Sequence, residues 1–297
     1  MAVLCAGIAL SAGMASALGV FARGDGSVES VTNVRGVAFE MVTTGVYANN
    51  AQRVVAEGIG WDLFTLIVAV PALLAASVLV ARGSFRGRLF ALGLLGYFFY
   101  QYLEYAVTWA FGPLFLLFVV IYAASLAGMV WIGISIAREG VEGRFSERFP
   151  HRAWAALNVT MSTLLTLLWL QRIAAALGGD LTAGGLTSET TMTVQALDLG
   201  LVVPTSVLVG VLAWRRSPAG YVLGAAYAVT FVAMASAIIG MLLSAWAVER
   251  TLAVVPVAIF GLAAAVAVGL GIRIYGSVLP APPRSPASAA RTAPVAA

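Results

Sequence analysis

The segment Trp61–Val80, WDLFTLIVAVPALLAASVLV, decides the fold class of this chain. Its only charged residue is Asp62, near the start, and the rest is apolar or small. A helix that crosses the hydrocarbon core of a bilayer needs about 20 such residues. Backbone groups inside lipid must be paired within the protein, and a continuous apolar run achieves this as a helix, whereas a barrel strand alternates. The segment therefore predicts a transmembrane helix.

Similar runs extend along the whole chain. Hydrophobic residues make up 61% of the 297 residues, charged residues make up 10%, and the mean hydropathy is +0.96. Soluble domains carry roughly a quarter charged residues. We therefore predict an all-α fold, a polytopic transmembrane helix bundle with one membrane domain over residues 1–279. Its eight predicted spans are Val3–Ala22, Trp61–Val80, Leu89–Phe111, Pro113–Ala137, Ala153–Ala176, Ala196–Trp214, Tyr221–Trp246 and Leu252–Tyr275.

Two connections between the spans are sizeable, Arg23–Gly60 and Gly178–Gln195, and neither is long enough for a separate domain. Within the first, Val37–Glu57 mixes polar and apolar residues, which favours an interfacial helix leading into the second span. Residues 280–297 are rich in Pro, Ala and Ser. This composition predicts a disordered cytoplasmic tail without packing potential.

The arginines indicate the orientation of the spans. All 17 basic residues are arginine, which indicates the composition bias of a bacterial genome rich in G and C. Twelve lie in the second, fourth and sixth connections or after the last span, and Arg23, Arg35, Arg53, Arg172 and Arg250 lie on the other side. Loops rich in basic residues stay in the cytoplasm. We therefore predict a bacterial plasma-membrane protein with both termini in the cytoplasm.

The first span has an alternative interpretation as a cleaved signal peptide. Ala15, Ser16 and Ala17 provide small residues at the spacing of a cleavage site. However, Met1–Leu4 contains no basic residue, and signal peptides normally begin with one. The sequence therefore favours a retained transmembrane helix.

The second half of the chain repeats features of the first at matching topological positions. Asp62, Val70-Pro71 and Arg82 are echoed by Asp198, Val203-Pro204 and Arg215. The spacing from proline to arginine is the same in both, whereas the spacing from aspartate to proline differs. Such symmetry is typical of duplicated transporter-like folds with parallel repeats. We predict one repeat over about 1–150 and a second over about 151–279, with Asp62 equivalent to Asp198 and paired kinks at the two prolines. The alternative is a chance likeness between Ala-, Leu- and Val-rich helices.

Two stretches carry a resemblance to known proteins. Val194–Pro204, VQALDLGLVVP, and Gly112–Leu117, GPLFLL, resemble strings in a family of bacterial multi-pass membrane proteins that has no assigned reaction. The similarity covers most of the chain, and its motifs are moderately specific. The resemblance implies a multi-pass topology and supplies no catalytic residue.

Polar residues inside predicted spans are the candidate site, because they are costly in a membrane unless they face an interior or a cavity. Glu104 lies deepest, and Tyr97, Gln101 and Thr108 share its face of the third span at helical spacing. Asn158 begins a polar stripe on the fifth span that ends near Arg172. We predict that Arg172 reaches inward to neutralise Glu104. The remaining members of this tentative ligand-binding set are Asp62, Gln195 and Asp198 at the outer mouth.

The alternative for these polar residues is structural. An ion pair between Glu104 and Arg172 would lock two helices together. Asp62 and Asp198 would cap the starts of their helices, where the helix dipole favours negative charge.

Several function classes have no support in the sequence. The scattered arginines form no basic stripe for nucleic acid. One cysteine, Cys5, excludes an intrachain disulfide and a cysteine-based metal cluster, and one histidine, His151, excludes bis-histidine haem ligation and a HExxH zinc site. No lysine is present for a retinal Schiff base, and no nucleophile elbow, P-loop or dinucleotide fingerprint occurs. We therefore expect no cofactor and no metal.

A carrier for a small solute or ion, or a ligand-sensing membrane protein, is the function that the sequence favours. Its expected partners are the lipid bilayer and a small molecule or ion. Two alternatives stay open. One is a non-catalytic membrane scaffold or assembly partner, and the other, less favoured, is an enzyme acting on a lipid or quinone through two facing acids.

Overall fold

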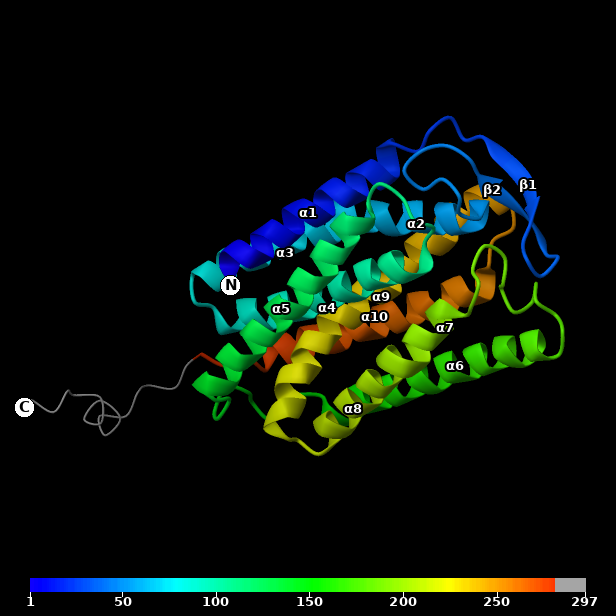
Figure 1. Cartoon of the computed structure of the whole chain (residues 1–297). Coiled ribbons are helices and arrows are strands. Elements are labelled where there is room, and N and C mark those ends of the chain that lie inside the picture. The colour runs from blue at the N-terminus through cyan, green and yellow to red at the C-terminus, as the bar shows by residue number, and fades with distance from the viewer. Residues whose placement is uncertain (281–297) are drawn as a thin grey trace, which may run out of the picture.

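The computed structural model describes residues 1–280, and within them the chain forms a bundle of eight helices (Figure 1). The predicted all-α membrane bundle is therefore confirmed. Two of the eight helices contain a π-helical turn: α2, η1 and α3 run on as one helix, as do α7, η2 and α8. The elements are α1 (Ala2–Phe21), β1 (Val28–Thr32), β2 (Ala38–Val42), α2 (Gln52–Phe64), η1 (Thr65–Ala69), α3 (Val70–Ala81), α4 (Phe85–Thr108), α5 (Phe115–Glu139), α6 (His151–Leu177), α7 (Thr193–Leu197), η2 (Asp198–Val202), α8 (Val203–Trp214), α9 (Pro218–Glu249) and α10 (Val254–Gly276).

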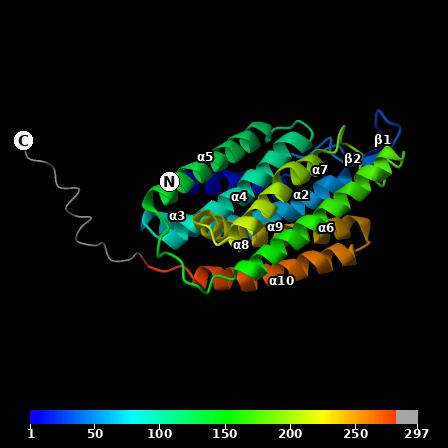
Figure 2. The same ribbon diagram turned by 90° about the horizontal axis from the view of Figure 1, so that it is seen from below.

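Seven of these helices are long and apolar enough to cross a membrane, and each corresponds to one predicted span. The eighth helix, α4, carries Arg86 and Arg88 near its start and Gln101 and Glu104 near its end, which lowers its hydropathy. Most residues of α4 are buried, and it lies between α5 and α9 (Figure 2). The charged side chains of Arg88 and Glu104 are thus shielded from lipid by the neighbouring helices.

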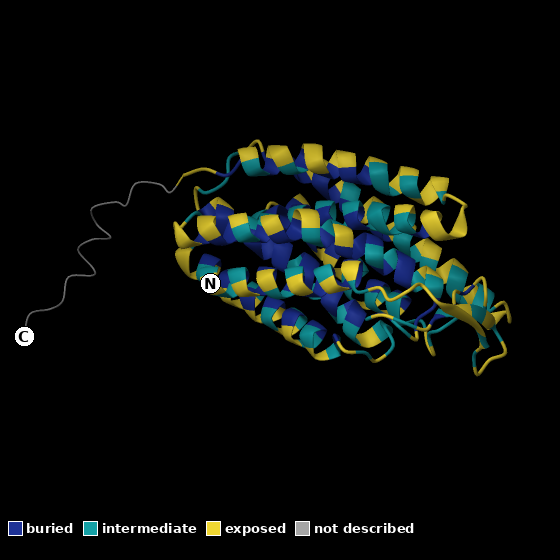
Figure 3. Ribbon diagram, turned by 90° about the horizontal axis from the view of Figure 1, so that it is seen from above, coloured by how far each residue is buried: buried dark blue, intermediate teal, exposed yellow. Residues whose placement is uncertain are grey.

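The outer faces of the bundle are apolar. Leu116 is 72% exposed, and Leu262 and Ile272 are each 69% exposed. Figure 3 shows the exposed residues on the outer sides of the helices and the buried ones turned towards the interior. Burying apolar area away from water contributes roughly 25 cal/mol per Å², so such a surface is stable only when lipid covers it. The chain is an integral membrane protein in contact with a lipid bilayer.

The helices alternate in direction, so α1 begins and α10 ends at the same end of the bundle (Figure 1). The connections at residues 82–84, 140–150 and 215–217 lie at this end, which we name the arginine-rich end. The strands and the α6–α7 connection lie at the opposite end, which we name the hairpin end. The predicted disordered tail falls almost wholly on residues 281–297, outside the described part of the chain.

The predicted interfacial helix over Val37–Glu57 is wrong. Ala38–Val42 forms β2, which pairs antiparallel with β1 from Val28 opposite Val42 to Thr32 opposite Ala38. The turn between the strands contains Gly36 at φ +81°, a conformation that glycine adopts without a steric penalty. Buried and exposed residues alternate along β2, as in a strand, and the following helix begins at Gln52, earlier than the predicted Trp61.

Each π-helical turn lies directly before a Val-Pro pair. Proline has no N–H, and its ring clashes with the carbonyl four residues earlier, so a regular helix is disturbed there. At these places the helix is wider, because an N–H donates to the carbonyl oxygen five residues earlier instead of four. Val70 N–H donates to Thr65 O, and Val203 N–H donates to Asp198 O. The predicted paired disturbance at Pro71 and Pro204 therefore takes the form of two π-helical turns.

The segments after the two prolines match closely at a constant offset. Each proline is the second residue of a 12-residue helix that begins at the preceding valine, and the residue after each helix is an arginine, Arg82 or Arg215. Next comes a residue with positive φ, and then a serine whose side chain caps the following helix by accepting an N–H bond. Extended upstream, the same offset places Asp198 opposite Thr65, and Gln195 opposite Asp62. This register differs from the aspartate pairing expected from the sequence.

Candidate functional site

Polar and aromatic side chains gather inside the hairpin-end half of the bundle, between α2, α4, α6 and the π-helical turns. We name this group the outer polar cluster. Three carboxylates, several hydroxyls and two indoles belong to it. Its members are Trp61, Asp62, Thr65, Tyr97, Tyr100, Gln101, Glu104, Tyr105, Trp169 and Asp198.

Asp62 lies inside α2 and is fully buried. Tyr47 donates a hydrogen bond to its Oδ2 at 2.5 Å, and Tyr105 donates to Oδ1 at 3.5 Å. Gly19 of α1 lies so close that an added Cβ would overlap this carboxylate and the Tyr47 hydroxyl. Asp62 therefore joins α1, α2, α4 and the segment after the hairpin.

Asp198 begins η2 and is also buried. Tyr100 donates a hydrogen bond to its Oδ1, and Trp169 Nε1 donates to Oδ2 at 2.8 Å. This carboxylate thus joins α4 and α6 to the widened turn. The expectation that Asp62 and Asp198 cap helix starts is wrong, because their continuous helices begin earlier, at Gln52 and Thr193.

Thr65 begins the other widened turn, η1. Its Oγ1 lies 2.6 Å from the Tyr97 hydroxyl and 2.9 Å from both Gln101 Oε1 and Trp61 O, so its one proton is shared between the last two acceptors. The predicted site residues Tyr97 and Gln101 are therefore both in the cluster. Each of the two π-helical turns presents its first side chain to α4.

Four polar atoms of α2 and α4 are buried without a hydrogen-bond partner in the described part of the chain. They are Trp61 Nε1, Gln101 Nε2, Glu104 Oε2 and Thr108 Oγ1. Trp61 is 4% exposed, Gln101 0% and Glu104 7%. Leaving a buried polar group unpaired costs about 1–3 kcal/mol, so most native proteins avoid it. Such a concentration of unpaired donors and acceptors is a favourable place for the polar groups of a bound molecule.

Glu104 and Arg172 do not form the predicted ion pair among the described residues. The Arg172 guanidinium lies 5.2 Å from the centre of the Trp169 ring, near the hairpin end of α6. The charges that act on Glu104 belong to three acids, Asp198, Glu57 and Glu189. The long arginine side chain stays half-buried near the polar end of its helix instead of pairing with Glu104 inside the bundle.

The two remaining predicted residues differ in position. Asn158 accepts a hydrogen bond from Ser206 at 2.9 Å and donates to Trp154 O at 2.8 Å, so it belongs to the interface of α6 with α8. Gln195 is buried one helical turn before Asp198. We find no side-chain hydrogen bond for Gln195 within residues 1–280. Gln195 adjoins the cluster, and Asn158 does not contribute to it.

A groove of about 230 Å³ lies at the hairpin end, between the β1–β2 turn and the α6–α7 connection. Its walls include Asn33, Arg35, Thr187, Glu189 and Thr190. Asn33 Nδ2 donates to Thr187 O at 2.7 Å, and Arg35 Nη2 donates to Thr190 O at 2.6 Å, so two side chains latch the hairpin to the connection. Burial raises the pKa of the Glu189 carboxyl, and hydrogen bonds from its neighbours oppose this in part.

Sequence reasoning missed this groove and five members of the cluster, which are Trp61, Thr65, Tyr100, Tyr105 and Trp169. The groove forms between two connections far apart in the chain, so no local sequence pattern indicates it. Tyr105 and Tyr47, which lies outside the cluster, donate to Asp62 from different elements, so their contacts leave no local pattern either. The one available signal was the spacing of Trp61 and Thr65, one turn apart on the same helix as Asp62.

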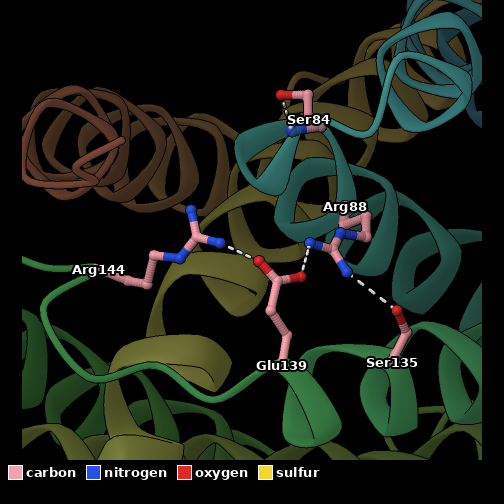
Figure 4. A network of polar contacts seen from close by, with 6 residues as sticks. Ser84, Arg88, Ser135, Glu139 and Arg144 are labelled. Carbon is pink, nitrogen blue, oxygen red and sulfur yellow. Dashed lines mark hydrogen bonds and ion pairs between the residues drawn. The ribbon is translucent and has the colours of Figure 1, made fainter. Parts of the chain in front are cut away.

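A second charged network lies at the arginine-rich end (Figure 4). Arg88 donates to Glu139 and, at 2.9 Å, to Ser135 Oγ, while Arg144 donates to the other oxygen of Glu139. Both guanidinium groups also lie against the Phe85 ring. Here every charge has an opposite partner, so the network fastens α4 to α5 and to the α5–α6 connection. It contrasts with Glu104, whose charged neighbours are all acidic.

Residues 1–280 contain no group of three or more His, Cys, Asp or Glu side chains placed to hold a metal ion. The chain matches no family model, no curated protein and no solved structure. The outer polar cluster and the groove above it are therefore the basis on which a function can be proposed.

Proposed function

We propose that this integral membrane protein is a carrier for a small solute, with a binding site at the outer polar cluster that opens towards the hairpin end. The observation that carries the proposal is the set of four buried, unpaired polar atoms on α2 and α4. A solute that offers both donors and acceptors would satisfy them. Asp62 and Asp198 belong to the same cluster, and in the proposal the solute approaches it from the groove that Glu189 lines at the hairpin end.

The two π-helical turns support movement of the site. At each turn the regular hydrogen-bond ladder is interrupted, and Pro71 and Pro204 remove a further donor. Widened turns of this kind are frequent at functional sites, and helix bends are commonly located there. Bending at η1 and η2 would move Thr65 and Asp198 relative to α4. In the proposal this exposes the solute alternately to the two sides of the membrane.

The proposal includes a duplicated architecture, with repeats over about 1–150 and 151–279. It is supported by the matching order of π-helical turn, Val-Pro, arginine, positive-φ residue and serine cap in both halves. In parallel repeats the substrate site lies between the halves near the membrane interior. In the proposal Thr65 and Asp198 lie at such a site, each on its own repeat.

We further propose that the hairpin end faces outward and the arginine-rich end faces the cytoplasm of a bacterial cell. The support is the excess of arginine in the short connections at one end.

The test is solute uptake by purified protein reconstituted in proteoliposomes, with Glu104→Gln as the variant. The matched control is Glu29→Gln, which removes an exposed acid at the same end of the bundle. We expect uptake of a transported solute to fall at least about tenfold for Glu104→Gln, because an intramembrane carboxylate is a mark of a functional site and glutamine lacks its charge, and to be unchanged for Glu29→Gln. Copurification of a protein partner without any Glu104-dependent uptake would refute the carrier and favour a scaffold.

A further inference from the structure

The charges in the hairpin-end half of the bundle do not balance around the cluster. Arg53 pairs with Glu57 at 3.1 Å and with Glu249 at 2.9 Å, and Arg172 also acts on Glu57. These two arginines and two glutamates offset one another. Glu104, Asp62 and Asp198 have no basic side chain at ion-pair distance within the described residues.

An ionised carboxylate inside a membrane is costly without a counter-charge. Tyrosine and tryptophan donors reduce this cost at Asp62 and Asp198. At Glu104 the Trp109 indole acts on the carboxyl group, and Oε2 is left without a hydrogen bond. The charges with the largest effect on Glu104 belong to Asp198, Glu57 and Glu189, and these three are negative. A positively charged solute would lower the electrostatic energy of the cluster, and an anion would raise it.

Aromatic rings surround the same place. Trp61 packs edge-on against Tyr105 at 5.5 Å between ring centres, and it lies 6.4 Å from the Tyr100 ring. Faces of tryptophan and tyrosine attract organic cations, by about 0.5–2 kcal/mol each. A small inorganic ion keeps its water or demands several oxygen ligands, whereas an alkylammonium group is matched by one carboxylate and aromatic faces.

The groove at the hairpin-end surface has one acidic side chain, Glu189, and one basic side chain, Arg35, in its lining. Glu189 lines the groove and also acts on Glu104, so the entrance and the cluster share one negative field. The guanidinium of Arg35, the basic residue of this groove, is held to Thr190 O by a hydrogen bond at 2.6 Å. A volume of about 230 Å³ is below the range of about 300–1,000 Å³ for sites of drug-sized ligands, which favours a smaller molecule.

We infer that the solute is a small organic cation with an ammonium-type charge, taken up through the groove and bound between Glu104 and the Trp61, Tyr100 and Tyr105 rings. This inference rests on the proposed carrier function and names its substrate class.

Four probes of similar simplicity test the charge directly. Tetramethylammonium is the cation, tert-butanol is a neutral molecule of similar shape, pivalate is the anion, and sodium is the inorganic cation. Calorimetric titration of the purified full-length chain should show saturable binding of tetramethylammonium only. Glu104→Gln should weaken this binding at least about tenfold, equivalent to 1.4 kcal/mol. Glu189→Gln should give a smaller loss, and Glu29→Gln should give none.

The aromatic part of the inference has its own pair of variants. Trp61→Phe keeps an aromatic face, and Trp61→Leu removes it. We expect Trp61→Leu to weaken tetramethylammonium binding by about two- to thirtyfold, from the range of cation–π energies, and Trp61→Phe to weaken it less. If Glu104→Gln does not fold, the unaltered chain can be labelled with a hydrophobic carbodiimide. Tetramethylammonium should then protect Glu104 from modification, and pivalate should not.

Each of the following results would refute either the substrate class alone or both the substrate class and the carrier function. Glu104-dependent binding of tert-butanol or pivalate would refute the cationic substrate and leave the carrier standing. Sodium binding that depends on Glu104 and is not displaced by tetramethylammonium would refute the organic cation. Glu104-independent binding of every probe, or no binding, together with unchanged uptake by Glu104→Gln, would refute both the inference and the proposed function.

Discussion

The close contact of α2 with α9 gives a sharp test of how the site is held. Gly60 adjoins Trp61 and Asp62, and it packs on Gly240 of α9. A Cβ added to Gly60 would lie 2.6 Å from the carbonyl carbon of Gly240 and 2.8 Å from Cβ of Ser244, closer than such atoms approach in real structures. Gly60→Ala should therefore force the two helices apart.

The magnitude follows from a comparison with Gly261→Ala. Gly261 lies in α10 with open space where its Cβ would be. Both substitutions gain the same preference of alanine for a helix, about 0.5–1 kcal/mol, so this contribution cancels in the difference. Overpacking typically costs about 1–3 kcal/mol. We expect Gly60→Ala to be less stable than Gly261→Ala by that amount, or by roughly 2–4 °C per kcal/mol in the unfolding midpoint for a chain of this size.

The assay is thermal unfolding of both variants in the same detergent, followed by circular dichroism. A proper readout compares each variant with the unaltered chain at one protein concentration. Equal midpoints for Gly60→Ala and Gly261→Ala would show that α2 and α9 do not touch at Gly60, and the position of Trp61 and Asp62 would then be wrong.

Three further predictions concern the hydrogen bonds of the site. Tyr100→Phe removes the donor to Asp198 Oδ1 and should lower the unfolding free energy by about 1.5–3 kcal/mol, the range for bonds to charged groups, with no loss expected for Tyr122→Phe as the control. Pro71→Ala and Pro204→Ala supply a backbone N–H, so we expect a higher unfolding midpoint together with slower uptake; faster uptake would contradict the role of the π-helical turns. The pKa of Glu189 is raised in the folded chain, so the folded chain holds this proton more tightly than the unfolded chain does. The stability that this proton gives to the contact between the hairpin and the α6–α7 connection is therefore fully present below the pKa of Glu189 in the unfolded chain. It is lost as the pH rises through the pKa of Glu189 in the folded chain. Hydrogen exchange at residues 186–190 should accelerate with pH more than in Glu189→Gln, and equal profiles would exclude Glu189 as the cause.

The helices could be predicted because lipid imposes a simple rule on sequence. Eight apolar runs gave eight helices, and even α4 was found, although Glu104 and Gln101 lower its hydropathy. Burial between α5 and α9 explains why it tolerates them. The strands escaped prediction because a short hairpin depends on the pairing of Val28–Thr32 with Ala38–Val42 and leaves only a weak local signal.

The candidate site was predictable as a set of residues but not as a set of contacts. The high cost of placing an ionisable side chain in a membrane drew attention to Asp62, Glu104 and Asp198, and all three are buried. It could not assign partners, because Tyr47, Tyr100 and Trp169 reach them from other elements. The expected ion pair of Glu104 with Arg172 does not form, and the reason depends on where Arg172 lies in the folded chain. Arg172 lies near a helix end and has the Trp169 ring beside it, so it need not enter the bundle.

The central claim is that Glu104 lines a site reached from the hairpin end. Cys5 is the only cysteine, so Cys5→Ala provides a background in which Glu104→Cys can be labelled alone. A membrane-impermeant, positively charged methanethiosulfonate added to the hairpin side of sealed vesicles should label it. Ser135→Cys, at the arginine-rich end, should react only from the opposite side. Labelling of Glu104→Cys solely from the arginine-rich side, or from neither side, would contradict the account.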